Sequence, residues 1–387
     1  MCQHDGERDE SPDLQAEDGN LEVSTGPSTA VETARPPRRF SLGLDRFSGI
    51  YLWILFIAVF GIWTPSEFLT TSTLHGIASG QAVTAMVALA VLIPLAAGLY
   101  DLSVGATANV TGILVVVMMN NHHWAVVPAV VLALGVGLAI GVVNAIVVVR
   151  LRVNSFIATL GMSSILSAVL VIESGDASPV APLSTAWNDF TQHTIAGFQL
   201  VVVYMLLLAL ILWWLMAHTP TGRYLYAIGG NEEAARLSGV RVKRLSTFAL
   251  ILSSGIAGLA GVLFTSQNGP SLDFGPALLL PAFAAAFLGS TQLQPGKFNV
   301  WGTLLAIYVL ATGVQGLELV SGAVWLSDMF NGVALIIAVA LSVNRNTGVR
   351  RRKLTRVGGG GPSTAQTEPT EAESDDAVAA QKATGPM

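Results

Sequence analysis

The chain has 387 residues, of which 52% are apolar and only 12% charged, and its formal net charge is −5 at pH 7. Soluble domains are about one quarter charged, and several apolar runs here approach the ~20 residues that cross a ~30 Å hydrocarbon core as a helix. The composition excludes an ordinary soluble domain and predicts an all-α polytopic membrane protein. The single cysteine, Cys2, excludes an intramolecular disulfide and a cysteine metal site.

The N-terminal residues, 1–45, are polar and rich in Pro, Ser, Glu and Asp, which is typical of a disordered tail. They do not resemble a secretory signal, because the first apolar run begins near Phe47. We therefore expect a tail before a transmembrane domain that covers residues 46–345.

Ten apolar runs follow the tail. The eighth is short and contains Pro281, so a re-entrant segment is the alternative to a span there. The predicted spans are Phe47–Trp63, Ala78–Leu99, Leu102–Met119, Trp124–Val149, Phe156–Ile172, Ile195–Met216, Leu245–Thr265, Leu272–Leu288, Trp301–Leu319 and Val324–Val343.

The basic residues indicate the orientation. With the N-terminus in the cytoplasm and ten spans, all 20 Lys and Arg residues fall in inner loops and tails, as the positive-inside rule expects. Without the eighth span, the basic segment "RNTGVRRRKLTR" would lie outside. We therefore expect ten spans, both termini in the cytoplasm, and a basic and then glycine-rich flexible tail over residues 346–387.

One inner loop, residues 218–244, is long and polar. Its sequence "GRYLYAIGGNEEAARLSGVRVKR" has five basic and two acidic residues. Such a loop either lies on the membrane surface, held by lipid head groups, or docks a cytoplasmic protein.

The same loop contains signals for a short helix. Asn231 is suited to the N-cap, and Glu232 and Glu233 would occupy the first turn, where the helix dipole favours carboxylates. Gly239 suits the left-handed position past the C-terminus. The pattern predicts a helix over residues 232–238, and because a helix of two turns is marginal alone in water, it needs a further contact.

The middles of the predicted spans lack charged residues. Ion-coupled and proton-coupled carriers usually keep acidic residues or His near the midplane. The sequence therefore disfavours the alternative function, an ion- or proton-coupled secondary transporter of a small polar solute, and favours a neutral cargo. The candidates for the substrate pathway are Asn109, Thr111, Thr159 and Ser163, for which interhelical hydrogen bonding is the competing role.

Asp101 stands at the inner end of the third span, where we expect it to cap that helix rather than to contact substrate. The small residues in "SSGIAGLAG" predict close helix packing in the seventh span, which includes the dimer interface as one possible place.

No ATP site is expected in this chain. The nearest sequence to a phosphate-binding loop is "GSTQLQPGKF". A P-loop has four residues between its first Gly and the Gly-Lys pair, and Ser or Thr after the Lys. Here six residues separate Gly289 from Gly296, and Phe298 follows Lys297.

Four ordered stretches resemble a known family. They are "DLSVGA", "VNAIVVVRLRVNSFIATLGM", the polar loop with the following "STFALILSSGIAGLAGVL", and "NVWGTLLAIYVLATGVQGLELV". Together they resemble the permease subunits of ABC-type importers of ribose, xylose, arabinose and related monosaccharides. The similarity covers about residues 50–345.

This resemblance implies a permease in the bacterial plasma (inner) membrane, paired with a second permease copy. It further implies two cytoplasmic ABC ATPase subunits that use ATP and Mg²⁺, an extracytoplasmic sugar-binding protein, and a neutral sugar such as ribose as cargo. For this chain it implies contact with membrane lipid, and neither a bound cofactor nor a nucleic-acid partner. The polar loop would be the coupling element on the ATPase, through Arg223, Asn231, Glu232, Glu233, Arg236 and Gly239.

Overall fold

The computed structural model describes residues 44–340 except 176, 183 and 324. The predicted tail over residues 346–387 and nearly all of the tail over residues 1–45 lie outside the described residues. Within the described part, the chain is helical apart from its loops and one two-stranded hairpin. The all-α prediction is therefore confirmed for this part.

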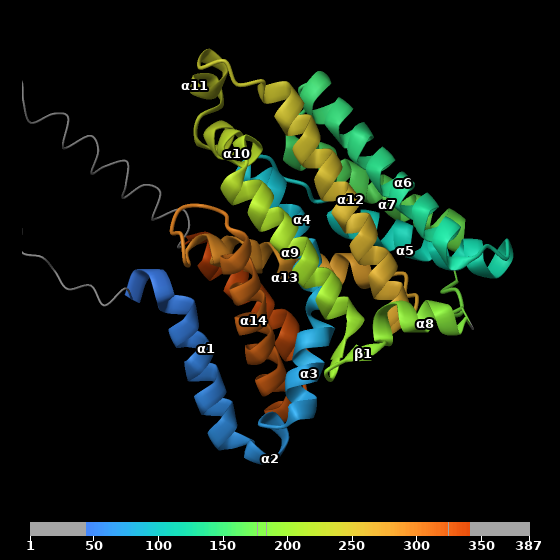
Figure 1. Ribbon diagram of the computed structural model, residues 1–387, viewed down its shortest axis with the longest axis vertical. Coiled ribbons are helices and arrows are strands. Elements are labelled where there is room, and N and C mark those ends of the chain that lie inside the picture. The colour runs from blue at the N-terminus through green and yellow to red at the C-terminus, as the bar shows by residue number, and fades with distance from the viewer. Residues whose placement is uncertain (1–43, 176, 183, 324, 341–387) are drawn as a thin grey trace, which may run out of the picture. The chain divides into compact units, whose positions relative to one another are not determined.

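The helices follow one another along the chain in the colour order of Figure 1. They are α1 (Leu44–Trp63), α2 (Pro65–Phe68), α3 (Thr71–Gly80), α4 (Ala82–Ala96), α5 (Val104–Asn121), α6 (Val126–Ala145), the π-helix η1 (Ile146–Arg150), α7 (Ser155–Ser174), α8 (Thr185–Gln192), α9 (Leu200–His218), α10 (Pro220–Gly230), α11 (Glu232–Leu237), α12 (Val242–Asn268), α13 (Phe274–Ser290), α14 (Val300–Ser321) and a last helix over Trp325–Ala340. The strands β1 (Thr194–Ile195) and β2 (Phe198–Gln199) pair antiparallel between α8 and α9.

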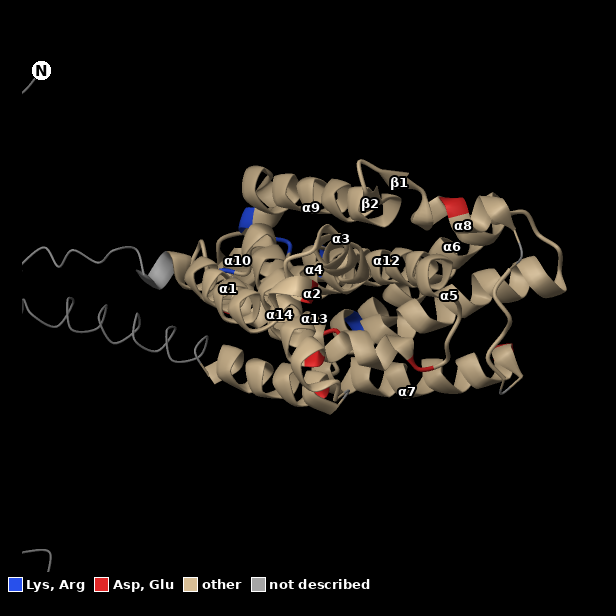
Figure 2. Ribbon diagram, turned by 90° about the horizontal axis from the view of Figure 1, so that it is seen from below, with Lys and Arg blue, Asp and Glu red and all other residues tan. Residues whose placement is uncertain are grey.

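The long helices are built to cross a membrane. Seven described segments are long and apolar enough to do so, and three further apolar helices are shorter. Each of these ten overlaps one predicted apolar run, although the second begins at Thr71 rather than Ala78 and the sixth at Leu200 rather than Ile195. Figure 2 shows the bundle almost free of Lys, Arg, Asp and Glu. The seven segments are Thr71–Ala96, Val104–Asn121, Val126–Arg150, Ser155–Ser174, Leu200–His218, Val242–Asn268 and Val300–Ser321, and the three shorter ones are Phe47–Trp63, Phe274–Ser290 and Trp325–Ala340.

The core is centred on α4. Every one of its 15 residues is buried, and it packs against α9, α12, α13 and α14. A helix that is apolar on all sides has no face to offer water, so it is stable only when neighbours or lipid surround it. The alanines of α4 let these neighbouring helices approach it closely.

The small residues of α12 lie inside the protomer. Gly258 faces Gly137 of α6, and Gly261 lies so close to the backbone of α5 at Ala108 that an added Cβ would overlap it. Close helix packing is thus confirmed, and it joins α12 to α5 and α6 of the same chain. Gly258 and Gly261 are buried in these contacts and are not available to a dimer interface.

The eighth apolar run forms one helix, α13, which continues through Pro281, in agreement with the predicted helix there. Other elements depart from the sequence-based expectation. Neither α8 nor the hairpin was predicted from the sequence. The turn of the hairpin has Ala196 and Gly197 at positive φ, as in a type I′ turn. Figure 1 places α8 and the hairpin at the opposite end of the helices from α10 and α11.

Candidate functional site

The polar loop between α9 and α12 contains two helices, one more than predicted. The additional helix, α10, begins with Pro220 at its first helical position after the extended residue Thr219, a favourable start because proline needs no hydrogen-bond acceptor there. Its buried residues are Gly222, Leu225 and Ile228. The proline and the three-residue spacing of Leu225 and Ile228 were the signals that could have revealed it.

The second helix, α11, is the predicted one. The Asn231 Oδ1 atom accepts a hydrogen bond from the Ala234 backbone N–H at 3.0 Å, which confirms the N-cap. Glu232 and Glu233 occupy the first turn. Gly239 follows the helix with a φ of 83°, as expected for a left-handed residue past a C-terminus.

Polar groups of α11 remain available to a partner. Arg236 pairs with Glu233 at 2.6 Å, but both side chains are more than 60% exposed, so the pair adds little to stability. Leu237, at the end of the helix, is 79% exposed. The sequence analysis did not single out Leu237, because a leucine in a short amphipathic helix is normally assigned to the buried face.

Arg223 lies apart from this group. It is on α10, where it faces a pocket that it shares with Lys297 of the α13–α14 loop. Of the six predicted coupling residues, the structure therefore gathers five on or beside α11 and places Arg223 on the neighbouring helix.

The end of α10 lies directly against the loop that joins α4 to α5. A Cβ added to Gly229 would come within 2.3 Å of the Ala96 carbonyl oxygen and 3.1 Å of the Gly98 nitrogen. Gly98 itself has a φ of 76°, which side chains other than glycine rarely tolerate. The two glycines thus permit a backbone contact between the polar loop and the core.

Asp101 lies in this α4–α5 loop and is fully buried. Its Oδ1 atom accepts hydrogen bonds from the backbone N–H of Ser103 at 3.1 Å and from the Ser103 hydroxyl at 2.6 Å. Asn144 of α6 donates to the same hydroxyl at 2.8 Å. The expectation that Asp101 caps α5 is therefore wrong: Ser103 is the N-cap residue, and Asp101 fixes Ser103.

The same loop is bonded to α7. The Tyr100 N–H donates to the Ser155 hydroxyl at 3.1 Å, and the Leu102 N–H donates to the Thr159 hydroxyl at 3.0 Å. Loop N–H groups that no helix can satisfy thus find side-chain acceptors, as buried backbone groups must.

The four pathway candidates do not share one location. Thr159 is buried against the α4–α5 loop, as described above. Asn109 is buried and donates to the Leu272 carbonyl, while Thr111 is buried and donates to the Gly258 carbonyl at 3.2 Å. Ser163 is half-buried on α7. The structure thus places Asn109, Thr111 and Thr159 in three separate contacts with other segments.

Comparison with known proteins identifies the family. Residues 73–339 match the family described as the permease component of the branched-chain amino acid transport system. The chain belongs to this family of permeases. It is therefore a transporter subunit and a multi-pass protein of the plasma membrane.

Individual relatives of this permease cover most of its length. It is 32% identical over 304 residues to the ribose import permease protein of Escherichia coli K12, covering 76% of this chain and 92% of that protein. It is 29% identical over 308 residues to the D-allose transport system permease protein of Escherichia coli K12, covering 79% and 94%. It is also 29% identical over 321 residues to the autoinducer 2 import system permease protein of Salmonella choleraesuis, covering 81% and 91%. No solved structure matches the chain.

Proposed function

We propose that this permease forms the membrane path of an ATP-binding cassette importer for a neutral sugar such as ribose or a related monosaccharide. The curated relatives support this cargo class by their names, which include ribose and D-allose. The described helices also support it, because their charged residues lie near helix ends. A neutral polyol needs hydroxyl and amide partners and no buried counter-ion.

The topology that we propose has ten spans with both termini in the cytoplasm. The ten apolar helices and the distribution of Lys and Arg support it together. In this arrangement α10 and α11 face the cytoplasm, while α8 and the hairpin face outward, where an extracytoplasmic sugar-binding protein would dock. A second permease copy would complete the path.

The exposure of α11 is the observation on which this function depends. It is a helix of six residues, too short to persist alone in water, and its terminal Leu237 is largely exposed. A cytoplasmic ATPase that covers Leu237 and meets Glu232, Glu233 and Arg236 would supply the missing contacts. ATP and Mg²⁺ belong to that partner, which would pass its closure to the permease through α11.

The proposal is tested by reconstituting the permease in liposomes with the ATPase and the binding protein from neighbouring reading frames. We expect uptake of radiolabelled ribose or allose only when both partners and ATP are present. Leu237→Asp should lower uptake and ATPase binding about tenfold, the effect of losing ~1.4 kcal/mol at an interface. Val180→Asp is the matched control for ATPase binding, because Val180 is a 76% exposed apolar residue in the α7–α8 loop, on the side away from the ATPase.

Two results would contradict this function. The first is full sugar uptake by the permease alone, and the second is uptake that follows a proton or sodium gradient without ATP. The second result would favour the alternative, a secondary transporter.

A further inference from the structure

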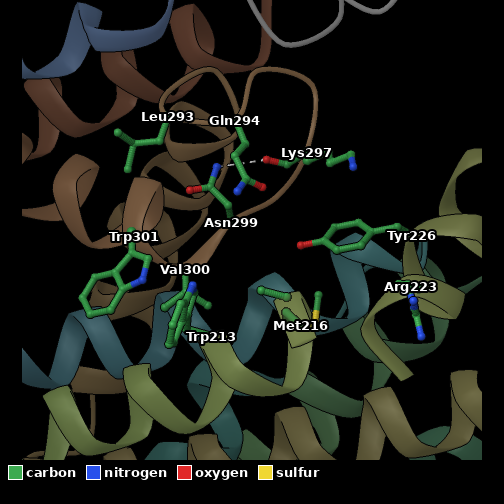
Figure 3. A pocket seen from close by; sticks show the side chains of 11 residues that line it. Trp213, Met216, Arg223, Tyr226, Leu293, Gln294, Lys297, Asn299, Val300 and Trp301 are labelled. Carbon is green, nitrogen blue, oxygen red and sulfur yellow. Dashed lines mark hydrogen bonds between the residues drawn. The ribbon is translucent and has the colours of Figure 1, made fainter. Parts of the chain in front are cut away.

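A pocket with two chemically distinct ends lies where α9 ends, beside α10 and the loop that leads into α14. Its volume is about 430 Å³. Figure 3 shows Arg223 and Lys297 at one end beside Tyr226, and Trp213 and Trp301 at the other end. The site belongs to neither α11 nor the α4–α5 loop.

The first end is cationic. Arg223 and Lys297 are both exposed, and among the described residues no carboxylate lies within ion-pair distance of either one. Lys297 Nζ lies 5.8 Å from the centre of the Tyr226 ring, and the Tyr226 hydroxyl donates to the Phe298 carbonyl. Burial raises the pKa of Tyr226 to about 12, so this hydroxyl stays neutral and the described residues do not offset the two positive charges.

The position of Lys297 is fixed by its own loop. The Asn299 Nδ2 atom donates to the Lys297 carbonyl at 3.1 Å and to the Gly289 carbonyl at 3.0 Å. The Asn299 Oδ1 atom accepts from the Gly302 N–H at 2.7 Å. This buried amide therefore holds the loop against the start of α14, which places the lysine beside Tyr226 as part of a defined site.

The second end is aromatic and partly open. The ring centres of Trp213 and Trp301 are 6.3 Å apart, and Trp301 is 40% exposed. Tryptophans concentrate at the depth where hydrocarbon meets head groups. Trp213 lies in the last two turns of α9 and Trp301 at the start of α14, which the proposed topology puts at the cytoplasmic boundary of the membrane. An aromatic end there, beside a cationic end, matches a ligand that is anionic at one end and apolar at the other.

We propose that this pocket binds the phosphate head group of an anionic phospholipid, with the glycerol and upper acyl chains against the two tryptophans. Basic pockets between transmembrane helices on the cytoplasmic side are suited to anionic head groups. A free phosphate or phosphorylated metabolite would use Arg223 and Lys297 equally well, but it would leave the aromatic end without a ligand. The lipid occupies both ends.

The test uses the purified full-length chain in a zwitterionic detergent and needs no transport activity. Phosphatidylglycerol with brominated acyl chains is titrated while tryptophan fluorescence is recorded, with brominated phosphatidylcholine of the same chains as the neutral comparison. We expect stronger quenching by the anionic lipid, and we expect Trp301→Phe to remove part of that quenching. Millimolar inorganic phosphate should not reverse it.

Single-charge variants locate the site. Arg223→Gln and Lys297→Gln should each raise the half-saturating lipid concentration about fivefold, which corresponds to ~1 kcal/mol for one basic residue. Arg152→Gln is the matched control, because it removes one exposed positive charge from the loop before α7. Circular dichroism melting of each variant checks folding, and the exposed Lys297 provides the test if Arg223→Gln does not fold.

Three outcomes would overturn the proposal. One is equal quenching by the anionic and neutral lipids. Another is the same loss of affinity in Arg152→Gln as in Lys297→Gln, which would indicate general surface charge. The third is displacement of the lipid by inorganic phosphate, which would assign the pocket to a free anion.

Discussion

Replacing Gly229 by Ala tests the contact between the polar loop and the core. Gly229 is the second-last residue of α10, and it is followed by Gly230, which ends α10, and by Asn231, the N-cap of α11. At an open helical position, Gly→Ala stabilises a protein by up to ~1 kcal/mol. At Gly229 the added Cβ would come within 2.3 Å of the Ala96 carbonyl oxygen. That oxygen belongs to the backbone, so it cannot rotate away.

The size of the effect follows from this overlap. Ordinary contact begins near 3.4 Å, so α10 and the α4–α5 loop must separate by about 1 Å. Overpacking of this kind costs ~1–3 kcal/mol, more than the gain in helix propensity. Since only Asn231 separates α11 from α10, the displacement would also reach the proposed ATPase site. A loss of ~1–2 kcal/mol of coupling would lower ATP-driven uptake about 5–30-fold.

The assay compares Gly229→Ala with Gly230→Ala. Gly230 is adjacent and helical, yet an added Cβ there would meet nothing within 4 Å. We expect Gly229→Ala to lower both the melting temperature and sugar uptake in liposomes, while Gly230→Ala matches or exceeds the parent protein in stability. Equal stability and uptake for the two variants would refute the reasoning, because the two differ only in the contact with the α4–α5 loop.

Three further changes probe the cap, the helix packing and the buried acid. Asn231→Ala should cost ~1 kcal/mol of α11 stability and weaken ATPase binding about fivefold in a titration; unchanged affinity would contradict the role of the cap. Gly112→Ala should lower the melting temperature, because its Cβ would lie 2.7 Å from a backbone carbonyl of α12, whereas Gly135→Ala, with open space around it, should not. Asp101→Ala should be less stable than Asp101→Asn by ~2 kcal/mol in denaturant unfolding, because only Asn keeps an oxygen for the Ser103 donors; equal stability would show that those bonds are weak.

The sequence could predict the long apolar helices and α11 because their signals are local. A run of ~20 apolar residues is sufficient for a span, and Asn231 with its two glutamates and Gly239 marks both ends of a short helix. Each signal depends on neighbours along the chain, and the structure contains the matching helices.

The rest depends on contacts between distant segments. The helix α10 had local signals in Pro220 and in the spacing of Leu225 and Ile228, but its packing against α4 and α12 joins distant segments and could not be read from that spacing. The exposure of Leu237 is a property of the folded surface. Asp101 was assigned to the wrong partner because its role depends on where α5 begins, and Ser103 takes the cap position. The separation of Arg223 from α11 likewise follows from the turn at Asn231.

The structure also suggests why a motif as short as Asp101–Ser103 would matter to a transporter. The α4–α5 loop is bonded to α7 through Ser155 and Thr159 and to α6 through Asn144, and it lies against α10 at Gly229. Interiors this densely packed pass on displacements because they have little free volume to absorb them. A push on α11 would therefore move α10 against this loop, and the loop would shift α6 and α7 together. A loop bonded only to its own helices would not couple them, so the buried side-chain bonds are the feature that this route requires.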